Sequence, residues 1–358
     1  MVLFKDISKN SLTELFYYLN GMRMEYRKKL NLPDFITFGN EIEVNDIILD
    51  DAKAIVKEFN SDRHLSKNDS FDTREELTCD SEIVTPIMTD SIKYWDLLYD
   101  MYLLLDNEGA TFSYNTSSHV HMGTKCIDSK EKLSLLLKTL VVFEPIIFKF
   151  GYGRDDLPRE YMTYMPHGSN YSMIMSPKRV RDFLEYLDRK NIDGKELNAM
   201  LDTFLNMDIR VRSAFNFRQF NFPKLYSSEY QDAPDHMEFR NFNSADPIVV
   251  QNNIDLCGHI FLAVVNGKID KEYVKAEYEK YKKKRYCFDE YCGVLDVDTT
   301  GAQYNRILNG YNKVKLDKAF KLADMIFDDD ISKFHFLKQY LKLYHRDDEY
   351  IRSLEKKN

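Results

Sequence analysis

FITFGNEIEV, residues 35–44, alternates apolar and polar side chains in the way that is typical of a β-strand with two unlike faces. One face would carry the apolar side chains Ile36, Phe38, Ile42 and Val44. The other face would carry two acids, Glu41 and Glu43, beside Thr37 and Gly39. Residues two apart on a strand lie roughly 6–7 Å apart, so these carboxylates repel one another unless a cation lies between them. The stretch therefore predicts both a strand and a site that attracts positive charge.

Further strands are predicted that also carry polar side chains on one face. They are residues 79–90 (CDSEIVTPIMTD, ended by Pro86), 117–123 (SSHVHMG), 211–220 (VRSAFNFRQF) and 236–242 (HMEFRNF). The side chains that share a strand face in these stretches are the pair His119 and His121, the pair Asn216 and Arg218, and the set His236, Glu238 and Arg240. Glu82 is a lone acid in an apolar strand. If these strands pair with their polar sides together, the acids, imidazoles and guanidinium groups converge on one surface.

Amphipathic stretches between the strands predict helices. The predicted helices are residues 10–30, 52–59, 90–105, 130–148, 176–187 and 246–265, and residues 62–70 are predicted as a strand that runs into a turn. Because strands and helices follow one another without a regular βαβ rhythm, the predicted fold class is α+β with a mostly antiparallel sheet.

Two parts of the chain differ in character. Residues 1–267 are predicted to form the main, catalytic domain, with the N-terminal helix at 10–30 and a core at 35–265. Beyond Gly267 the chain is polar and rich in Lys and Tyr, so residues 268–358 are predicted as a mainly helical C-terminal extension.

The composition of the 358 residues indicates a packed globular protein, with 44% hydrophobic residues, 24 Tyr and 24 Phe. The net charge of -8 does not provide the positive field that nucleic-acid binding needs, and the basic run at 280–285 fits a solvated helix end. Five cysteines without a CxxC pair indicate neither a disulfide framework nor a zinc knuckle. The first residues lack the pattern of a secretory signal, and charges interrupt the apolar stretch 133–150, so a cytoplasmic protein without a membrane partner is predicted.

Carboxylates gathered on one sheet face favour a hard divalent cation such as Mg²⁺ or Mn²⁺, which prefers oxygen ligands and often bridges carboxylates and substrate phosphates. Each motif also has a simpler interpretation. Glu-x-Glu can be a solvated strand face, His-x-His a structural pair, and HMEFRNF a cross-strand salt-bridge strip. The combination of the motifs favours a metal site over these alternatives.

The motifs and their order resemble those of the amidoligases, a family of the carboxylate–amine ligase superfamily that also contains glutamine synthetase and glutamate–cysteine ligase. The matching stretches are FGNEIEV, NDSF followed by EIVTPI, SSHVHMG, SAFN and HMEFRNFNSADP, which span residues 35–265. Ser118 stands before His119 where the family often has an apolar residue, and residues 151–173 and 268–358 match no part of the family pattern.

This resemblance implies a fold and a reaction. The fold would be a curved, mostly antiparallel sheet of about six strands with helices on one face, like the catalytic domain of glutamine synthetase, followed by the C-terminal helical extension. In the reaction, a substrate carboxylate would take the γ-phosphoryl group of ATP, and an amine would then displace phosphate to leave an amide. The implied cofactors are ATP and roughly two or three Mg²⁺ ions, with Mn²⁺ as a substitute.

The resemblance also assigns roles to single residues. The implied metal ligands are Glu41, Glu43, Glu82, His119 and Glu238, of which Glu43 and Glu238 would also be catalytic. Arg240 would be catalytic by steadying the transferred phosphate through paired hydrogen bonds, and would also bind the nucleotide. His121 and Arg218 would contact the nucleotide phosphates, and Asn216 would support them.

The substrates stay open at this point. The expected partners are a carboxylate and an amine, each from a small molecule, a peptide or a protein side chain, and no oligomeric state is predicted. Four side chains could grip an anionic substrate or could simply cover the sheet edge: Arg154, Arg159, His167 and Tyr171. Three other functions fit the same fold: a phosphotransferase with a non-carboxylate acceptor, an amide hydrolase, and a non-catalytic nucleotide-binding module.

Overall fold

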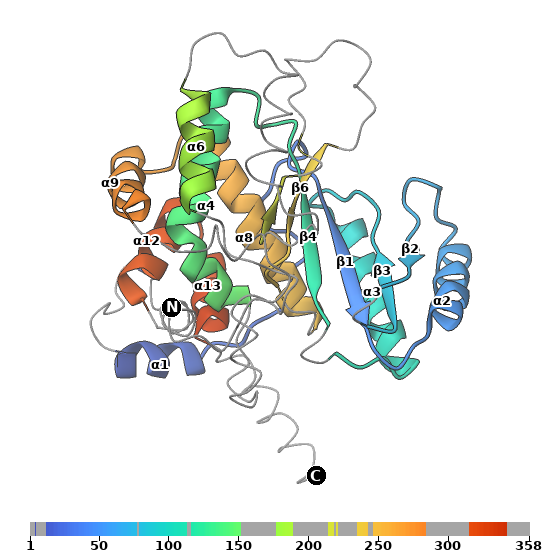
Figure 1. The fold of residues 1–358 in the computed structure, drawn as a ribbon. Helices are drawn as coiled ribbons and strands as arrows, with labels where there is room; N and C mark the ends of the chain where they lie inside the picture. The colour runs from blue at the N-terminus through green and yellow to red at the C-terminus, as the bar shows by residue number, and fades with distance from the viewer. Residues whose placement is uncertain are drawn as a thin grey trace, which may run out of the picture.

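The computed structural model describes residue 4 and residues 12–76, 79–112, 116–151, 177–188, 214–217, 220, 235–242, 246–283 and 315–341. These residues form a six-stranded sheet with neighbours in the order β2-β3-β1-β4-β6-β5 (Figure 1). The strands are β1 (Phe38–Val44), β2 (Asp72–Arg74), β3 (Ser81–Val84), β4 (Ser118–Gly123), β5 (Phe215–Asn216) and β6 (His236–Phe239). Each of these neighbouring pairs is antiparallel. The predicted α+β class and antiparallel sheet are therefore confirmed.

Helices cover the apolar face of the sheet. The described helices are α1 (Leu12–Asn20), α2 (Leu49–Asp62), α3 (Ile92–Asn107), α4 (Lys130–Gly151), α6 (Pro177–Leu187), α8 (Pro247–Val265), α9 (Lys271–Lys282), α12 (Leu316–Ile326) and α13 (Asp330–Tyr340). On α3, Trp95 stacks on Phe38 of β1 with ring centroids 5.2 Å apart. On α8, Phe261 approaches Phe239 of β6, with centroids 6.3 Å apart. The alternating apolar side chains of the strands are thereby removed from water, which stabilises this layer.

The N-terminal helix is shorter than predicted. In place of a helix over residues 10–30, α1 ends at Asn20 and non-helical chain leads to β1. The reason is tertiary bonding, which overrides helix propensity. Gln251 of α8 bonds both the N–H and the C=O of Arg27, at 2.7 and 2.6 Å. The buried carboxylate of Asp90 accepts backbone N–H groups a few residues farther along the same segment.

The strand predicted at residues 62–70 is wrong. α2 continues to Asp62, and a turn follows in which His64 has a positive φ of 50°. The side chain of Asn60 bonds both the N–H and the C=O of Phe71 and so closes this turn. The strand in this region is β2, which lies at the edge of the sheet. It begins at Asp72, whereas the predicted strand ends at residue 70.

The helices beyond Gly267 pack against α4 and α8 (Figure 1). Tyr273 of α9 stacks on Phe143 of α4 with ring centroids 6.0 Å apart, and Phe336 of α13 stacks on Phe150 of α4 at 5.2 Å. One continuous cluster of buried apolar side chains runs from the sheet into these helices. The domain boundary at residue 267 stays a prediction.

The most apolar long helix is a core helix. Within the described residues, α8 has the length and composition that would allow it to cross a membrane, with a mean hydropathy of 1.5. In the folded chain 83% of that window is buried inside the protein. Its apolar side chains are thus covered by the sheet and by neighbouring helices.

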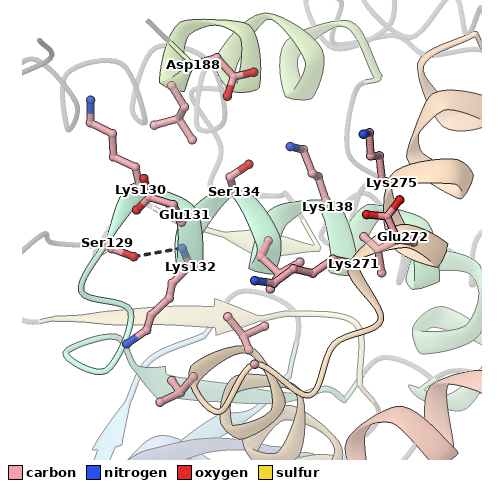
Figure 2. A pocket seen from close by; sticks show the side chains of 16 residues that line it. Ser129, Lys130, Glu131, Lys132, Ser134, Lys138, Asp188, Lys271, Glu272 and Lys275 are labelled. Carbon is pink, nitrogen blue, oxygen red and sulfur yellow. Dashed lines mark hydrogen bonds between the residues drawn. The ribbon is translucent and has the colours of Figure 1, made fainter. Parts of the chain in front are cut away.

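A surface groove of about 820 Å³ crosses α4 between α6, α9 and the end of α8 (Figure 2). Its charged lining residues are Lys130, Lys132, Lys138, Lys271 and Lys275, together with Glu131, Asp188 and Glu272. Lys132 is already paired with Asp128 at 2.8 Å. Both lysines and carboxylates line this groove, so its lining is of mixed charge.

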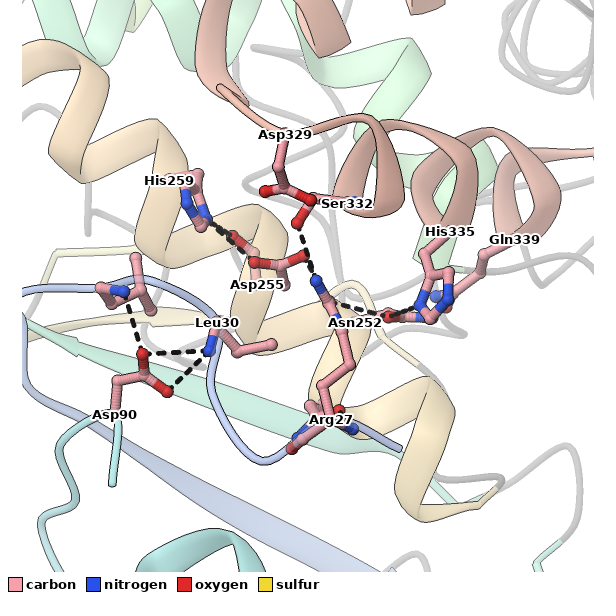
Figure 3. Close-up of polar contacts among 12 residues, drawn as sticks. Arg27, Leu30, Asp90, Asn252, Asp255, His259, Asp329, Ser332, His335 and Gln339 are labelled. Carbon is pink, nitrogen blue, oxygen red and sulfur yellow. Dashed lines mark hydrogen bonds and ion pairs between the residues drawn. The ribbon is translucent and has the colours of Figure 1, made fainter. Parts of the chain in front are cut away.

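A buried polar network joins the segment before β1 to α8 and α13 (Figure 3). Arg27 Nη2 lies 2.6 Å from Asp255 Oδ2, and Arg27 Nη1 donates to Ser332 Oγ at 2.7 Å. His259 Nδ1 lies 2.9 Å from the other carboxylate oxygen of Asp255. The network fixes the C-terminal helix α13 to α8, the helix that supports the sheet.

Candidate metal centre on the polar face of the sheet

The strand register brings the predicted site residues together on the face opposite α3 and α8. The register pairs are Glu41 with His119, Glu43 with Glu82, His121 with Glu238, and Asn216 with Glu238. Arg240 follows on the same side of β6 and bonds to Glu238. Five strands thus contribute to one polar surface, because side chains two apart on each strand point the same way.

Some predicted residues cannot be placed. Arg218 lies outside the described residues, as do Arg154, Arg159, His167 and Tyr171. The roles assigned to all the site residues, as ligands or phosphate contacts, stay predictions.

His119 is the centre of the cluster. Its Nδ1 lies 2.9 Å from Glu41 Oε2 and 3.4 Å from Glu238 Oε1. Its Nε2 lies 3.7 Å from Glu43 Oε1 and 2.8 Å from the hydroxyl of Ser117. One buried imidazole therefore contacts carboxylates that come from two different strands.

Neighbouring donors orient two of these carboxylates. The backbone N–H of Ser117 donates to Glu43 Oε2 at 2.7 Å, and Asn216 Nδ2 donates to Glu238 Oε2 at the same distance. The guanidinium of Arg240 donates to the other oxygen of Glu238. Each carboxylate keeps lone pairs that these donors do not use, as a metal ligand requires.

Three sets of side chains bring ligand atoms within 4.8 Å of one another: Glu41, His121 and Glu238; Glu41, Glu82 and His119; and Glu43, Glu76 and Glu82. Ligand atoms around one Mg²⁺ ion are separated by up to about 4 Å, since each metal–oxygen bond is about 2.1 Å. The sets share members, so neighbouring ions would be bridged by the same carboxylates.

The electrostatics of the cluster keep two acids ionised. Burial raises the pKa of the Glu41 carboxyl, but His119 and His121 outweigh it and hold that pKa far below its usual range. Burial likewise raises the pKa of Glu238, and the charges of Arg240 and His119 reverse the effect and lower it. Both carboxylates are therefore anionic at neutral pH and suited to bind a cation.

Glu82 is the strongest sign that a cation fits here. It is only 4% exposed, and no hydrogen bond or ion pair to its carboxylate is found among the described residues. Burial, together with the charges of Glu41 and Glu43, raises its pKa to about 8. Without a cation this carboxyl is therefore mostly protonated at neutral pH. Because buried charges are normally paired or bound to metal, a divalent cation is the partner that suits its ionised form.

Most of the cluster lines a cavity of about 630 Å³, namely Glu41, Glu82, His119, His121, Glu238 and Arg240, whereas Glu43 is not among the lining residues. The cavity is also lined by residues that the sequence did not single out as functional, chiefly Arg74, Glu76 and Asp235. His236 was placed on the correct strand face but was given no role. Its ring centroid lies 4.7 Å from that of His121, and burial and the charge of His121 lower its pKa to about 4. Arg74 ends β2 and Glu76 follows it, and both lie outside the stretch predicted as a strand.

The larger groove over α4 does not compete with this site. The sets of metal-ligating side chains among the described residues lie on the strands or, for Glu76, just after β2. The lysines of the groove are exposed or half-buried and lie among acids (Figure 2). Size alone does not define a functional pocket, whereas convergent polar groups with shifted pKa values do indicate one.

Replacement of Glu82 by Gln should stabilise the metal-free protein and abolish its stabilisation by metal. Burial and the two neighbouring acids raise the pKa of Glu82, which means that this carboxyl destabilises the metal-free fold, whereas a neutral amide does not. We therefore expect a gain on the order of 1 kcal/mol at pH 7. Urea unfolding with and without Mg²⁺ measures both effects. Glu58→Gln, on the exposed face of α2, is the matched control and should change neither value. A variant that loses stability without metal, or is still stabilised by Mg²⁺ like the wild type, contradicts the role of Glu82.

Comparison with known proteins yields matches among solved structures. No family model matches the chain, and no curated protein matches it either. Among solved structures, the chain is similar to a bifunctional glutathione synthetase from Pasteurella multocida, with 10% sequence identity and a TM-score of 0.37. The match covers 87% of this chain and 52% of that enzyme, so the chain spans about half the length of its neighbour. An overlap of this quality does not assign the chain to a family.

Proposed function

We propose that this chain is an ATP- and Mg²⁺-dependent ligase that joins a carboxylate to an amine through an acyl-phosphate intermediate. The observation that carries the proposal is the set of buried acids around His119, of which Glu41, Glu82 and Glu238 line one cavity with the guanidinium of Arg240. Phosphoryl transfer depends mainly on positioning and on neutralising charge, and this set of side chains is suited to both.

The proposed reaction has two steps. In the first, an oxygen of the substrate carboxylate bonds to the γ-phosphorus of ATP while the bond to the bridging oxygen breaks, which releases ADP. In the second, the amine nitrogen bonds to the acyl carbon, the carbon–oxygen bond to phosphate breaks, and the amine gives up a proton. The products are an amide, ADP and inorganic phosphate.

The ligands for Mg²⁺ would be Glu41, Glu43, Glu82, His119 and Glu238. The ions would neutralise the charge that builds up on the phosphoryl oxygens. The chain itself supplies the orientation: Ser117 and Asn216 hold Glu43 and Glu238 by hydrogen bonds. Arg240 is held against Glu238 at the edge of the cluster, from which its planar guanidinium can donate paired hydrogen bonds to a phosphate group.

The test is an assay of ADP release with the full chain, Mg²⁺ and ATP, across panels of carboxylates and amines. The expected result is ADP formation that requires both substrates and Mg²⁺ and yields an amide of the corresponding mass. ADP formed only with a non-carboxylate acceptor would assign a phosphotransferase instead. Amide cleavage without ATP consumption would assign a hydrolase, and failure to bind Mg²⁺ and ATP in calorimetry would assign a non-catalytic module.

The cytoplasmic location also stays a proposal.

A further inference from the structure

The guanidinium of Arg74 lies at the metal cluster although it comes from the edge of the sheet. Arg74 ends β2 and is paired in register with Glu82 of β3. Its Nη1 donates to Glu41 Oε1 at 3.0 Å, and its side chain is 58% exposed and lines the cavity. A positive group on an exposed, flexible stem therefore rests on one of the candidate metal ligands.

The oxygen that Arg74 contacts is one that a metal ion would need. Glu41 belongs to two of the three sets of ligands, and its Oε1 lies 3.2 Å from His121 Nε2, a member of one of them. A guanidinium and a divalent cation both need the lone pairs of this oxygen, so they compete for it. Because an ion pair on an exposed stem contributes little, the cation would win this competition.

Arg74 and Arg240 lie on opposite sides of the ligands. The strand order β2-β3-β1-β4-β6 puts Arg74 at one end of the row and Arg240 at the other, with the acids and histidines between them. Arg240 is 15% exposed and is fixed to Glu238, whereas the Arg74 side chain is mostly in solvent. Arg74, with the more exposed side chain, is therefore the guanidinium that can leave its carboxylate more readily.

We infer that Arg74 occupies the cation position at Glu41 in the metal-free protein and moves to the triphosphate when metal and nucleotide bind. A guanidinium matches phosphate oxygens as well as it matches a carboxylate, so the same group serves both states. Arg74 would then be a nucleotide-binding residue on the side of the cavity opposite Arg240. The second half of this inference, the contact with ATP, rests on the proposed function.

Two binding measurements test the inference without any measurement of turnover. Mn²⁺ binding to the nucleotide-free protein is measured by electron paramagnetic resonance, and ATP binding at saturating Mn²⁺ by calorimetry. Arg74→Gln should bind Mn²⁺ about fivefold more tightly than the wild type, because the competing cation is gone. The same variant should bind ATP roughly tenfold more weakly, because a charge-assisted contact to phosphate is lost.

Arg63→Gln is the matched control. Arg63 lies in the same region of the chain and pairs with Asp100, but it does not line the cavity, and both affinities should stay at the wild-type values. Arg74→Lys keeps the charge and should leave Mn²⁺ binding closer to the wild type than Arg74→Gln does.

The outcomes separate this inference from the proposed function. Mn²⁺ affinity in Arg74→Gln equal to that of the wild type overturns the inference, whatever happens to ATP. Tighter Mn²⁺ binding with unchanged ATP affinity overturns the movement to the triphosphate. A wild-type protein that binds Mn²⁺ but not ATP overturns the proposed function, and the Mn²⁺ measurement still decides whether Arg74 holds the cation position.

Discussion

Glu41→Gln is expected to reduce turnover by about a hundredfold to a thousandfold, since removing charge stabilisation from a transition state typically costs a factor of this size. Glu41 belongs to two of the three sets of ligands and contacts His119, His121 and Arg74, so one substitution weakens several parts of the site. A neutral amide is a poor ligand for Mg²⁺ in place of a carboxylate. Glutamine has the same shape and keeps an oxygen that can accept from His119 or Arg74, so the fold should remain intact.

The measurement is the initial rate of ADP formation at saturating Mg²⁺ and ATP, with far-ultraviolet circular dichroism to check the fold. Glu58→Gln removes one exposed acid from α2 and should retain the wild-type rate. A wild-type rate in the folded Glu41→Gln variant would remove the basis for the metal assignment.

Asp255→Asn is expected to destabilise the folded chain by about 3–5 kcal/mol, because it leaves the buried guanidinium of Arg27 without its charged partner. The two side chains are 13% and 3% exposed, and their atoms lie 2.6 Å apart. Asp255 also faces His259 through its second oxygen (Figure 3). The measurement is urea unfolding at pH 7, with the fluorescence of Trp95 as the signal that reports unfolding.

Asp50→Asn is the matched control for this change. Asp50 pairs with Lys53 on the surface, with side chains 88% and 54% exposed, so its loss should cost less than about 0.5 kcal/mol. Equal losses in the two variants would contradict a stabilising role for the buried network. The double change Arg27→Met with Asp255→Leu removes both charges and should cost less than Asp255→Asn alone.

The stabilisation by this network should depend on pH in a defined direction. Burial raises the pKa of Asp255, but Arg27 and His259 outweigh it and lower the pKa from 3.8 to about 2. Its contribution is therefore present above pH 3.8 and is lost as the pH falls through about 2. Burial lowers the pKa of His259, but Asp255 outweighs it and raises the pKa above 6.5, so that contribution is complete below pH 6.5 and is lost at higher pH.

The difference in unfolding free energy between the wild type and Asp255→Asn should thus be largest between pH 3.8 and 6.5. Urea unfolding across pH 3 to about 9 measures it. A difference that is constant over this range would contradict the assigned protonation states.

The polar face of the sheet could be predicted because alternation along a strand is a local property. FGNEIEV, SSHVHMG and HMEFR each place their acids and imidazoles on one side of the strand. Because the apolar side must be buried, the polar side of each strand has to lie on the opposite face of the sheet. The pairing of Glu41 with His119 depends on the adjacency of β1 and β4, which the structure shows and which alternation along a single strand does not determine.

The missed features depend on contacts that are distant in sequence. The helix expected over residues 10–30 ends early because Gln251 and Asp90 bond the backbone that follows it. The sequence does not indicate a role for Arg74, because β2 has three residues and follows a turn closed by Asn60. Three residues are too few to show the alternation of apolar and polar side chains that predicts a strand. A side chain can be placed on a strand face from sequence alone only when the strand is long enough to alternate.

The strand order has a consequence for how the protein is made. The ligands that meet around His119 are separated by about 200 residues in the chain, and at roughly 5–20 residues per second a ribosome needs about 10–40 seconds to pass from the first to the last. During that interval the acids of β1 and β3 have emerged, while the strand that carries Glu238 has not. Two of the three sets of candidate ligands come from β1, β4 and the chain between them, and only the remaining set includes Glu238. The proposed magnesium site would therefore be assembled in two stages during translation and completed only when β6 has been made.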